Sequence, residues 1–382
     1  MSAEPRIVGA TDGDPWSGST WSGSSRRLFS ALERRGALAG AVSTRPRWLD
    51  LAEKAAAWQR DGTAWRQRYR AAASPISPLV RQAMTAIGSR RAAGVAPDAD
   101  VLLQISGWYD AGRRMRPRLF ATYQDANVAL WLRRPDLALS PDDRWIARTR
   151  EHELRIYDRM HLILTMSDWA RRSFIEDYGQ DPAKVVTVGA GANLDQIPEP
   201  PAERDLSSPR LLFVGRKFER KGGAELLEAF AALRAEHAGA ELTIIGPPPR
   251  GDGDGVRWLG PIFRDSPDEA RRLDESFRNA NVFVMPSIYE GFGIPFLEGM
   301  AYALPCVGTT ACAIPELVED GVTGRTVKPG DAGALAAALS DLCAQPEQSA
   351  AMGRAGRQRF LERYTWDRVA DRICHALSER LG

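Results

Sequence analysis

Two glutamates that stand eight positions apart, Glu290 and Glu298, flank a short turn of small residues. The apolar run 281–286 before them predicts a buried strand, and residues 295–303 after the turn predict the start of a helix. A glycine-rich turn at a helix N-terminus favours an anion, because free backbone N–H groups and the helix dipole both attract negative charge. The two carboxylates would repel that anion, so we expect them to bind neutral hydroxyl groups.

A cationic loop earlier in the chain points to the same ligand. Arg216 and Lys221 follow the predicted strand 211–214, and the loop that carries them ends at Gly222 before a predicted helix. Cations at the end of a strand can neutralise a diphosphate, although solvated loop charges are an equal alternative for these two residues alone. A ligand with both phosphates and several hydroxyl groups is a nucleotide sugar, which is the donor substrate that we predict.

The bulk composition limits the class of protein. A chain of 382 residues with 44% apolar and 26% charged residues is typical of a globular protein with two domains. Apolar runs of about 18 residues and a secretory signal are both absent, so we expect neither a membrane-spanning helix nor export. The four cysteines fit neither a zinc site nor a redox pair and predict thiols in a reducing cytoplasm: Cys306, Cys312, Cys343 and Cys374.

Charge is distributed unevenly along the chain. Residues 1–200 carry 29 Lys and Arg against 23 Asp and Glu, whereas the remainder carries 22 against 26. A basic first half can attract an anionic or lipid-linked acceptor or a membrane surface, which predicts a peripheral contact at the inner membrane face. The alternative is a general preference for arginine that has no function. Paired arginines are scattered along the chain, so we expect no nucleic-acid partner.

The order of predicted elements indicates the fold class. Strands alternate with helices on both sides of residues 197–209, a polar run with four prolines that is the best candidate for a linker. This pattern predicts an α/β protein with two Rossmann-like parallel-sheet domains that face each other across a cleft. We place the first domain at residues 1–200 together with a C-terminal helix at 366–382, and the second at 201–365.

Three segments in this order resemble one known family. They are Phe213-Val-Gly-Arg216 with the later Lys-Gly, the run from Ser287 to Ala301, and the run from Pro315 to Gly324. Together they resemble the glycosyltransferases of family 4, a large retaining group with the GT-B fold, and the resemblance covers residues 100–382 well. It implies an enzyme of the hexosyltransferase class, of a kind found in bacterial glycan, glycolipid or natural-product synthesis. It also implies that the last helix crosses back to the first domain.

The resemblance implies roles for matching positions. Glu298 would bind the ribose hydroxyls of the donor, and Glu290 would bind hydroxyls of the transferred sugar. The alternatives are a surface carboxylate for Glu290 and a helix-start charge for Glu298. The distal phosphate would be held by the backbone of Gly291, Phe292, Gly293 and Ile294, and the diphosphate by Arg216 and Lys221.

Candidates in the first domain are less well defined. No histidine stands where the family often places one, and Asp125 is our candidate for contact with the sugar or the acceptor, with a helix cap as its alternative. Gly18 lies in a Gly- and Ser-rich loop that corresponds to the family's first glycine loop and allows a close approach to the donor. The aromatic residues predicted to line the acceptor site are Trp16, Trp21, Trp108, Tyr109 and Tyr123.

We predict no cofactor and no metal. Two Asp-Gly-Asp triplets, at residues 12–14 and 252–254, match the metal-binding motif of other glycosyltransferases, but the second lies in a glycine-rich loop rather than at a strand end. The catalytic residues that we predict are Glu290, Asp125, Arg216 and Lys221. The alternatives are a phosphorylase or epimerase of the same fold and a nucleotide-sugar binding protein without activity.

Overall fold

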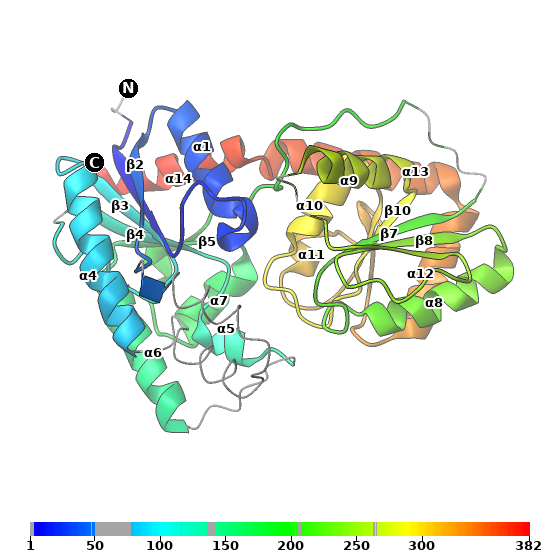
Figure 1. Ribbon diagram of the computed structural model, residues 1–382, viewed down its shortest axis with the longest axis horizontal. Coiled ribbons are helices and arrows are strands. Elements are labelled where there is room, and N and C mark those ends of the chain that lie inside the picture. The colour runs from blue at the N-terminus through cyan, green and yellow to red at the C-terminus, as the bar shows by residue number, and fades with distance from the viewer. Residues whose placement is uncertain are drawn as a thin grey trace. The chain divides into compact units, whose positions relative to one another are not determined.

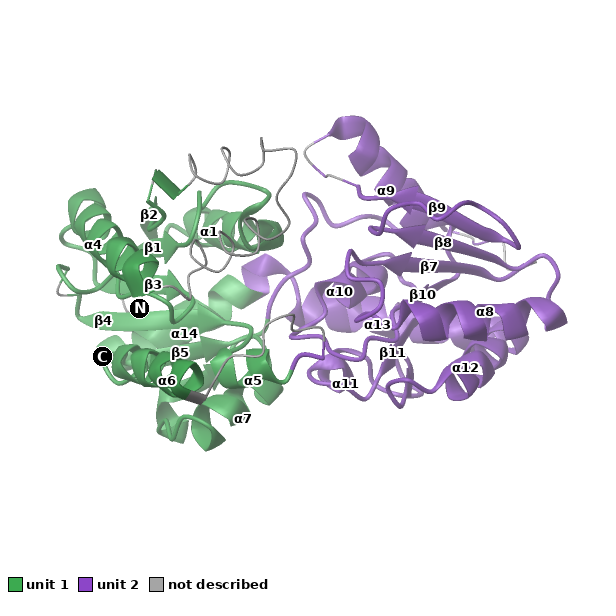
Figure 2. Ribbon diagram, turned by 60° about the horizontal axis from the view of Figure 1, so that its bottom comes forward, with its two compact units in different colours: residues 1–133, 137–189, 369–382 green, residues 134–136, 190–368 purple. Residues whose placement is uncertain are grey.

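A computed structural model describes residues 4–46, 48–49, 78–115, 117–135, 143–202, 204, 208–262, 264 and 266–382. The chain forms two compact units (Figure 2), of which unit 1 contains residues 1–133, 137–189 and 369–382 and unit 2 contains residues 134–136 and 190–368. The chain therefore passes from one unit to the other after Gly189, ahead of the proline-rich run. The sequence pattern of residues 50–72 also predicts a helix, and this segment lies outside the described residues.

Unit 1 is built on a six-stranded parallel sheet in the order β2-β1-β3-β4-β5-β6. Every residue of β1, β3 and β5 is buried, as is typical of parallel strands that helices cover on both faces. The strands are β1 Ile7–Thr11, β2 Leu38–Ser43, β3 Val101–Ile105, β4 Leu119–Gln124, β5 Leu162–Thr165 and β6 Val185–Thr187.

The helices of unit 1 connect these strands in the alternating order that the sequence predicts (Figure 1). They are α1 Ser24–Arg34, α4 Pro78–Val95, α5 Val128–Leu132, α6 Asp143–Tyr157 and α7 Asp168–Glu176. Ser167 caps α7, because its side chain accepts a hydrogen bond from the backbone N–H of Ala170 at 3.1 Å.

Unit 2 repeats this plan with a parallel sheet in the order β12-β11-β10-β7-β8-β9. Its strands are β7 Arg210–Val214, β8 Glu241–Ile245, β9 Val256–Gly260, β10 Val282–Val284, β11 Cys306–Thr309 and β12 Gly324–Val327. Strands β7 and β10 are neighbours, with Val282 opposite Leu211. Because the strands are parallel, the loops that follow β7 and β10 emerge at the same edge of the sheet.

The helices of unit 2 are α8 Gly223–Glu236, α9 Pro267–Asn279, α10 Ile294–Ala301, α11 Ile314–Leu317, α12 Ala332–Ala344 and α13 Pro346–Arg363. The last helix, α14 Trp366–Leu381, begins in unit 2, and its residues from Val369 onward belong to unit 1. The predicted architecture of two Rossmann-like parallel-sheet units with a returning C-terminal helix is confirmed.

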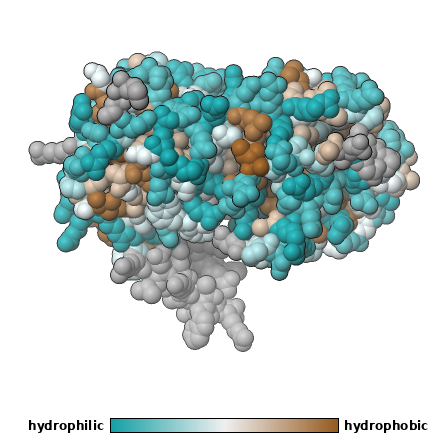
Figure 3. Space-filling view, turned by 90° about the horizontal axis from the view of Figure 1, so that it is seen from above, coloured by the Kyte–Doolittle hydropathy of each residue, from teal (hydrophilic) through white to brown (hydrophobic). Residues whose placement is uncertain are grey.

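The surface seen in Figure 3 is mainly hydrophilic. Hydrophilic residues, in teal, cover most of the described surface on this face, and hydrophobic residues, in brown, form small patches. None of the helices in the described part of the chain combines the length and apolar character needed to cross a membrane.

Candidate functional site

Two loops lie together at the carboxyl edge of the unit 2 sheet. One follows β7 and ends at Gly222, and the other joins β10 to α10. The backbone N–H of Ile288 in the second loop donates to the carbonyl of Arg220 in the first, at 3.0 Å. The structure therefore brings the predicted cationic loop and the segment with both glutamates to one place.

Glycine allows these loops to approach closely. Gly222 has a φ of 74°, and a Cβ atom there would lie 2.0 Å from the carbonyl oxygen of Pro286. A Cβ atom at Gly215 would lie 2.2 Å from Cδ of Lys221. Only glycine fits both positions without displacing the neighbouring loop or the lysine side chain.

Lys221 and Glu290 form a largely buried ion pair. The lysine Nζ lies 2.7 Å from Oε2 of Glu290, and the two side chains are 10% and 14% exposed. The same Nζ donates to Sδ of Met285 at 3.1 Å. An ammonium group has three donors, so one remains for a further acceptor such as a phosphate oxygen.

Glu298 also has a cationic partner. Its Oε1 lies 2.8 Å from an Nη atom of Arg264, and the glutamate side chain is only 5% exposed. Glu298 stands in the middle of α10 and reaches Arg264 in the segment between β9 and α9. Our reading of the sequence missed Arg264, although a cation that follows a strand was the signal that identified Arg216.

The residues between the two glutamates build the start of α10. Gly293 precedes the helix with a φ of 105°, and Pro295 occupies its first turn. A helix leaves its first N–H groups without partners inside the helix, so this segment offers donors to an anion. The Phe292 side chain is 4% exposed, and its ring meets Tyr364 edge-on at 6.4 Å, so only its backbone is offered to a ligand.

Arg216 is exposed on the loop after β7, at the same edge of the sheet. Together with Lys221 and Arg264 it places positive charge at the edge that carries the two carboxylates. Such a set can bind a ligand that has negative phosphates at one end and hydroxyl groups elsewhere. In the part of the chain that the structure describes, no cluster of His, Cys, Asp and Glu could hold a metal ion.

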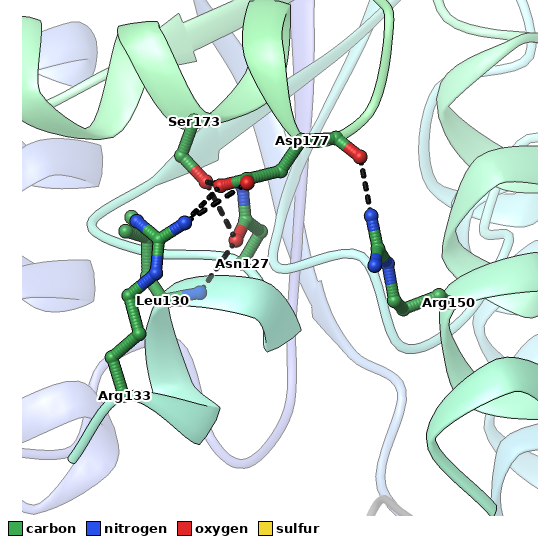
Figure 4. A network of polar contacts seen from close by, with 6 residues as sticks. All are labelled: Asn127, Leu130, Arg133, Arg150, Ser173 and Asp177. Atoms are coloured by element: carbon green, nitrogen blue, oxygen red, sulfur yellow. Dashed lines mark hydrogen bonds and ion pairs between the residues drawn. The ribbon is translucent and has the colours of Figure 1, made fainter. Parts of the chain in front are cut away.

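Asp125 follows β4 at the carboxyl edge of the unit 1 sheet. It does not cap the next helix, because the cap of α5 is Asn127, whose Oδ1 accepts from the N–H of Leu130 at 3.0 Å. Figure 4 shows how Asn127 is held: its Nδ2 donates to Oγ of Ser173 on α7 at 2.9 Å. Ser173 in turn donates to Asp177. The helix-cap alternative for Asp125 is therefore wrong.

A buried carboxylate that our reading of the sequence missed supports the same loop. Glu153 of α6 accepts from the Val128 N–H at 3.2 Å and from the hydroxyls of Tyr157 and Tyr178. Burial raises the pKa of Glu153 to about 7, and these donors oppose that rise. Tyr157 lies one helical turn away, but Val128 and Tyr178 are each 25 residues from Glu153, so no local pattern identifies the whole set.

The predicted acceptor residues differ in their exposure. Tyr109 and Tyr123 are fully buried, and their hydroxyls donate to backbone carbonyls, so in this conformation they support loops and offer no contact surface. Trp21 is partly exposed and meets Tyr123 edge-on at 5.5 Å, whereas Trp16 is 39% exposed. Trp108 is partly exposed at the start of the loop after β3.

Gly18 lies in the loop that joins β1 to α1. Its carbonyl oxygen would be 3.2 Å from a Cβ atom at Gly23, whose φ is 85°. Trp21 and Ser22 nearby also have positive φ angles, of 48° and 57°. Such angles are strained for residues other than glycine, and strained loops are common where a ligand binds.

The sequence of the second half matches a family model. Residues 208–345 match the model described as Glycosyl transferases group 1. The chain is 30% identical over 251 residues to MMP alpha-(1->4)-mannosyltransferase of Mycolicibacterium hassiacum, a match that covers 64% of this chain and 58% of that protein. It is 28% identical over 301 residues to D-inositol 3-phosphate glycosyltransferase of Geodermatophilus obscurus, covering 71% and 63%. The chain thus spans about three fifths of the length of these relatives.

Solved structures share the fold. Sucrose-phosphate synthase from Thermosynechococcus elongatus superposes with a TM-score of 0.69 at 18% identity, over 98% of this chain and 99% of that one. Anabaena Alr3699/HepE in complex with UDP and glucose gives 0.65 at 15% identity, over 98% and 99%. These matches confirm the predicted GT-B fold. The family model and the named relatives show that the second half of the chain is similar to a group 1 glycosyltransferase domain.

Proposed function

We propose that this protein is a retaining glycosyltransferase that moves a hexosyl group from a nucleotide diphosphate sugar to an acceptor hydroxyl without a metal ion. The observation that carries the proposal is the edge of the unit 2 sheet, where Glu290 pairs with Lys221 and Glu298 with Arg264. A relative from Mycobacterium tuberculosis that is 26% identical is named a GDP-mannose-dependent alpha-(1-6)-phosphatidylinositol monomannoside mannosyltransferase, which supports a GDP-sugar as donor and a lipid-linked acceptor. The relative named D-inositol 3-phosphate glycosyltransferase supports a phosphorylated acceptor, and the UDP bound to Anabaena Alr3699/HepE supports a UDP-sugar as the other candidate donor.

The ribose, the transferred sugar and the diphosphate of the donor each have a matching group in unit 2. Glu298 accepts hydrogen bonds from the ribose hydroxyls, and Arg264 fixes the orientation of its carboxylate. Glu290 accepts from hydroxyls of the sugar, because Lys221 occupies only one of its four acceptor positions in the described contacts. The diphosphate is bound by Arg216, by the remaining N–H donor of Lys221 and by the backbone N–H groups of residues 291–294.

The reaction needs electrostatic stabilisation more than covalent chemistry. The oxygen of the acceptor hydroxyl bonds to the anomeric carbon, the bond from that carbon to the diphosphate oxygen breaks, and the hydroxyl proton passes to the leaving diphosphate. Negative charge grows on the diphosphate as the bond breaks, and preorganised cations at that point lower the barrier. We assign acceptor binding to unit 1, with Asp125 as its candidate for contact with the acceptor.

The experiment has two steps. Thermal-shift screening against UDP-, GDP-, ADP- and dTDP-sugars identifies the donor, since a ligand at 100 times its dissociation constant stabilises by about 2.7 kcal/mol. Transfer is then measured for Glu290→Gln and for Glu347→Gln, an exposed carboxylate at the start of α13 in the same unit. We expect loss of roughly a hundredfold or more in kcat for the first variant and none for the second.

Other outcomes distinguish the alternatives. Release of sugar phosphate that requires inorganic phosphate and no acceptor would identify a phosphorylase of the same fold. Donor binding without any turnover would identify a binding protein. Near-normal transfer by Glu290→Gln would refute the role assigned to this residue.

A further inference from the structure

A groove lined with arginines lies in unit 1, apart from the residues assigned above. It has a volume of about 830 Å³ and is formed by the first half of α4, the length of α6 and the loop between β3 and β4. This size is in the range of small-molecule sites. The arginines that line it are Arg81, Arg113, Arg144, Arg148, Arg155 and Arg159.

The groove has more positive charge than its own acids neutralise. Asp110 and Glu151 are the carboxylates among its described lining residues, so six arginines minus two acids leave four positive charges. Both acids form ion pairs with arginines of the groove: Asp110 pairs with Arg159, and Glu151 lies 3.4 Å from Arg155. Arg81 interacts with the buried carboxylate of Glu153, so the positive charge that lacks a partner among the described residues is carried by Arg113, Arg144 and Arg148.

Two of these arginines form an unfavourable pair of like charges on helix α6. Arg144 and Arg148 are four residues apart on α6, so their like charges face the same side and repel each other. Both are exposed, as is Arg113 across the groove. The contacts of the described residues include no hydrogen bond or ion pair for any of these three arginines. Their arrangement opposes the stability of the free protein and favours an anion.

The wall of the groove is organised before any ligand arrives. Arg81 is 5% exposed, and its guanidinium lies 5.1 Å from the centre of the Trp108 ring. His152 of α6 is hydrogen-bonded to the carbonyl of Trp108 at 3.0 Å. The N–H of Asp110 donates to Oγ1 of Thr85 on α4 at 3.1 Å. These contacts fix the loop to both helices, so less conformational entropy is lost when a ligand binds.

We propose that this arginine groove is a binding site for a ligand that carries several phosphate groups. Guanidinium groups bind phosphate oxygens in pairs, and the described lining contains no lysine, which is the pattern of recognition by fork-shaped donors rather than by point charges. The phosphates belong either to a soluble molecule or to lipid headgroups. The inference does not depend on the proposed transfer reaction, because binding can be measured without any donor.

Titration with inorganic tripolyphosphate tests the site. The groove variant is Arg144→Gln with Arg148→Gln. Its matched control is Arg90→Gln with Arg172→Gln, which removes the same charge from two exposed arginines of unit 1 outside the groove. We expect the groove variant to bind at least tenfold more weakly and the control to bind as the wild type does. The same comparison is made with Arg216→Gln of unit 2 added to both proteins. The tenfold difference in tripolyphosphate affinity between the protein with and without the groove changes should persist, which separates the groove from the proposed donor site.

Vesicles distinguish the two sources of phosphate. Sedimentation with phosphatidylglycerol vesicles, and with phosphatidylcholine vesicles as the neutral reference, is compared for the wild type, the groove variant and the control. Loss of anionic vesicle binding in the groove variant alone supports a site for lipid headgroups, and an effect on tripolyphosphate alone supports a soluble ligand. The proposal is overturned if the wild type does not bind tripolyphosphate, or if the control loses as much affinity as the groove variant.

Discussion

The ion pair of Lys221 and Glu290 makes a quantitative prediction about stability. Replacing Lys221 with Met keeps much of the apolar stem but leaves a largely buried carboxylate without its cation. Replacing Glu290 with Gln keeps the shape and leaves the cation without its carboxylate. Because either single change leaves one charge uncompensated, the double variant should be more stable than the sum of the two single effects predicts.

The expected size follows from the geometry. Two unit charges 2.7 Å apart attract each other by about 6 kcal/mol at an effective dielectric constant of 20. Desolvation of both groups, which are 10% and 14% exposed, offsets much of this attraction. We therefore expect a coupling energy of roughly 1–3 kcal/mol from a double-mutant cycle.

The chain provides a matched control for this cycle. Arg250 and Glu219 lie in the same unit at the same distance of 2.7 Å, but their side chains are 51% and 76% exposed. Urea unfolding of both cycles should give a coupling below about 1 kcal/mol for the exposed pair. Added salt should weaken the exposed pair more than the buried one. A coupling for the buried pair that does not exceed the control would refute this reasoning.

Two further perturbations have clear expected outcomes. Folded Glu153 keeps a proton up to about pH 7, whereas the unfolded chain releases it near 4.5, so stability falls as pH rises between these values and is constant above them. The fall is roughly 3 kcal/mol and should be absent in Glu153→Gln, as urea unfolding at pH 5 and pH 8 would show. Gly222→Ala should cost more than the roughly 1 kcal/mol expected of Gly330→Ala, whose φ of 80° is similar but whose Cβ would meet no atom within 4 Å. Equal melting temperatures would contradict the clash with Pro286.

Most of the fold could be predicted from local patterns. The apolar runs 211–214 and 281–286 were identified as strands, and the structure confirms them with small shifts at their ends. Strand β2, Leu38–Ser43, was missed because its residues are mainly small ones with a low preference for strands. Helix α6 was missed as well, since its many arginines hide the apolar positions that face the core.

The site was predicted in part. The sequence indicated Glu290, Glu298, Arg216 and Lys221 as candidates, because each lies in a local motif, and the structure places them at one edge of the unit 2 sheet. It did not identify the partner of Glu298, since Arg264 is separated from it along the chain and only the parallel strand order brings the two loops to one edge. Pairing across a sheet depends on topology, which no window of neighbouring residues contains.

Because of helix α14, the unit that is synthesised first is the unit whose core is completed last. Unit 1 includes residues 369–382, and Val369, Ile373 and Leu377 of this segment are fully buried. Arg372 also donates to the carbonyl of Val188 at 2.7 Å. Unit 1 is therefore translated first but lacks part of its core until residues 369–382 leave the ribosome, whereas unit 2 has all of its residues earlier. A chain cut after Arg368 would keep every residue of unit 2 and damage the unit at the other end of the sequence.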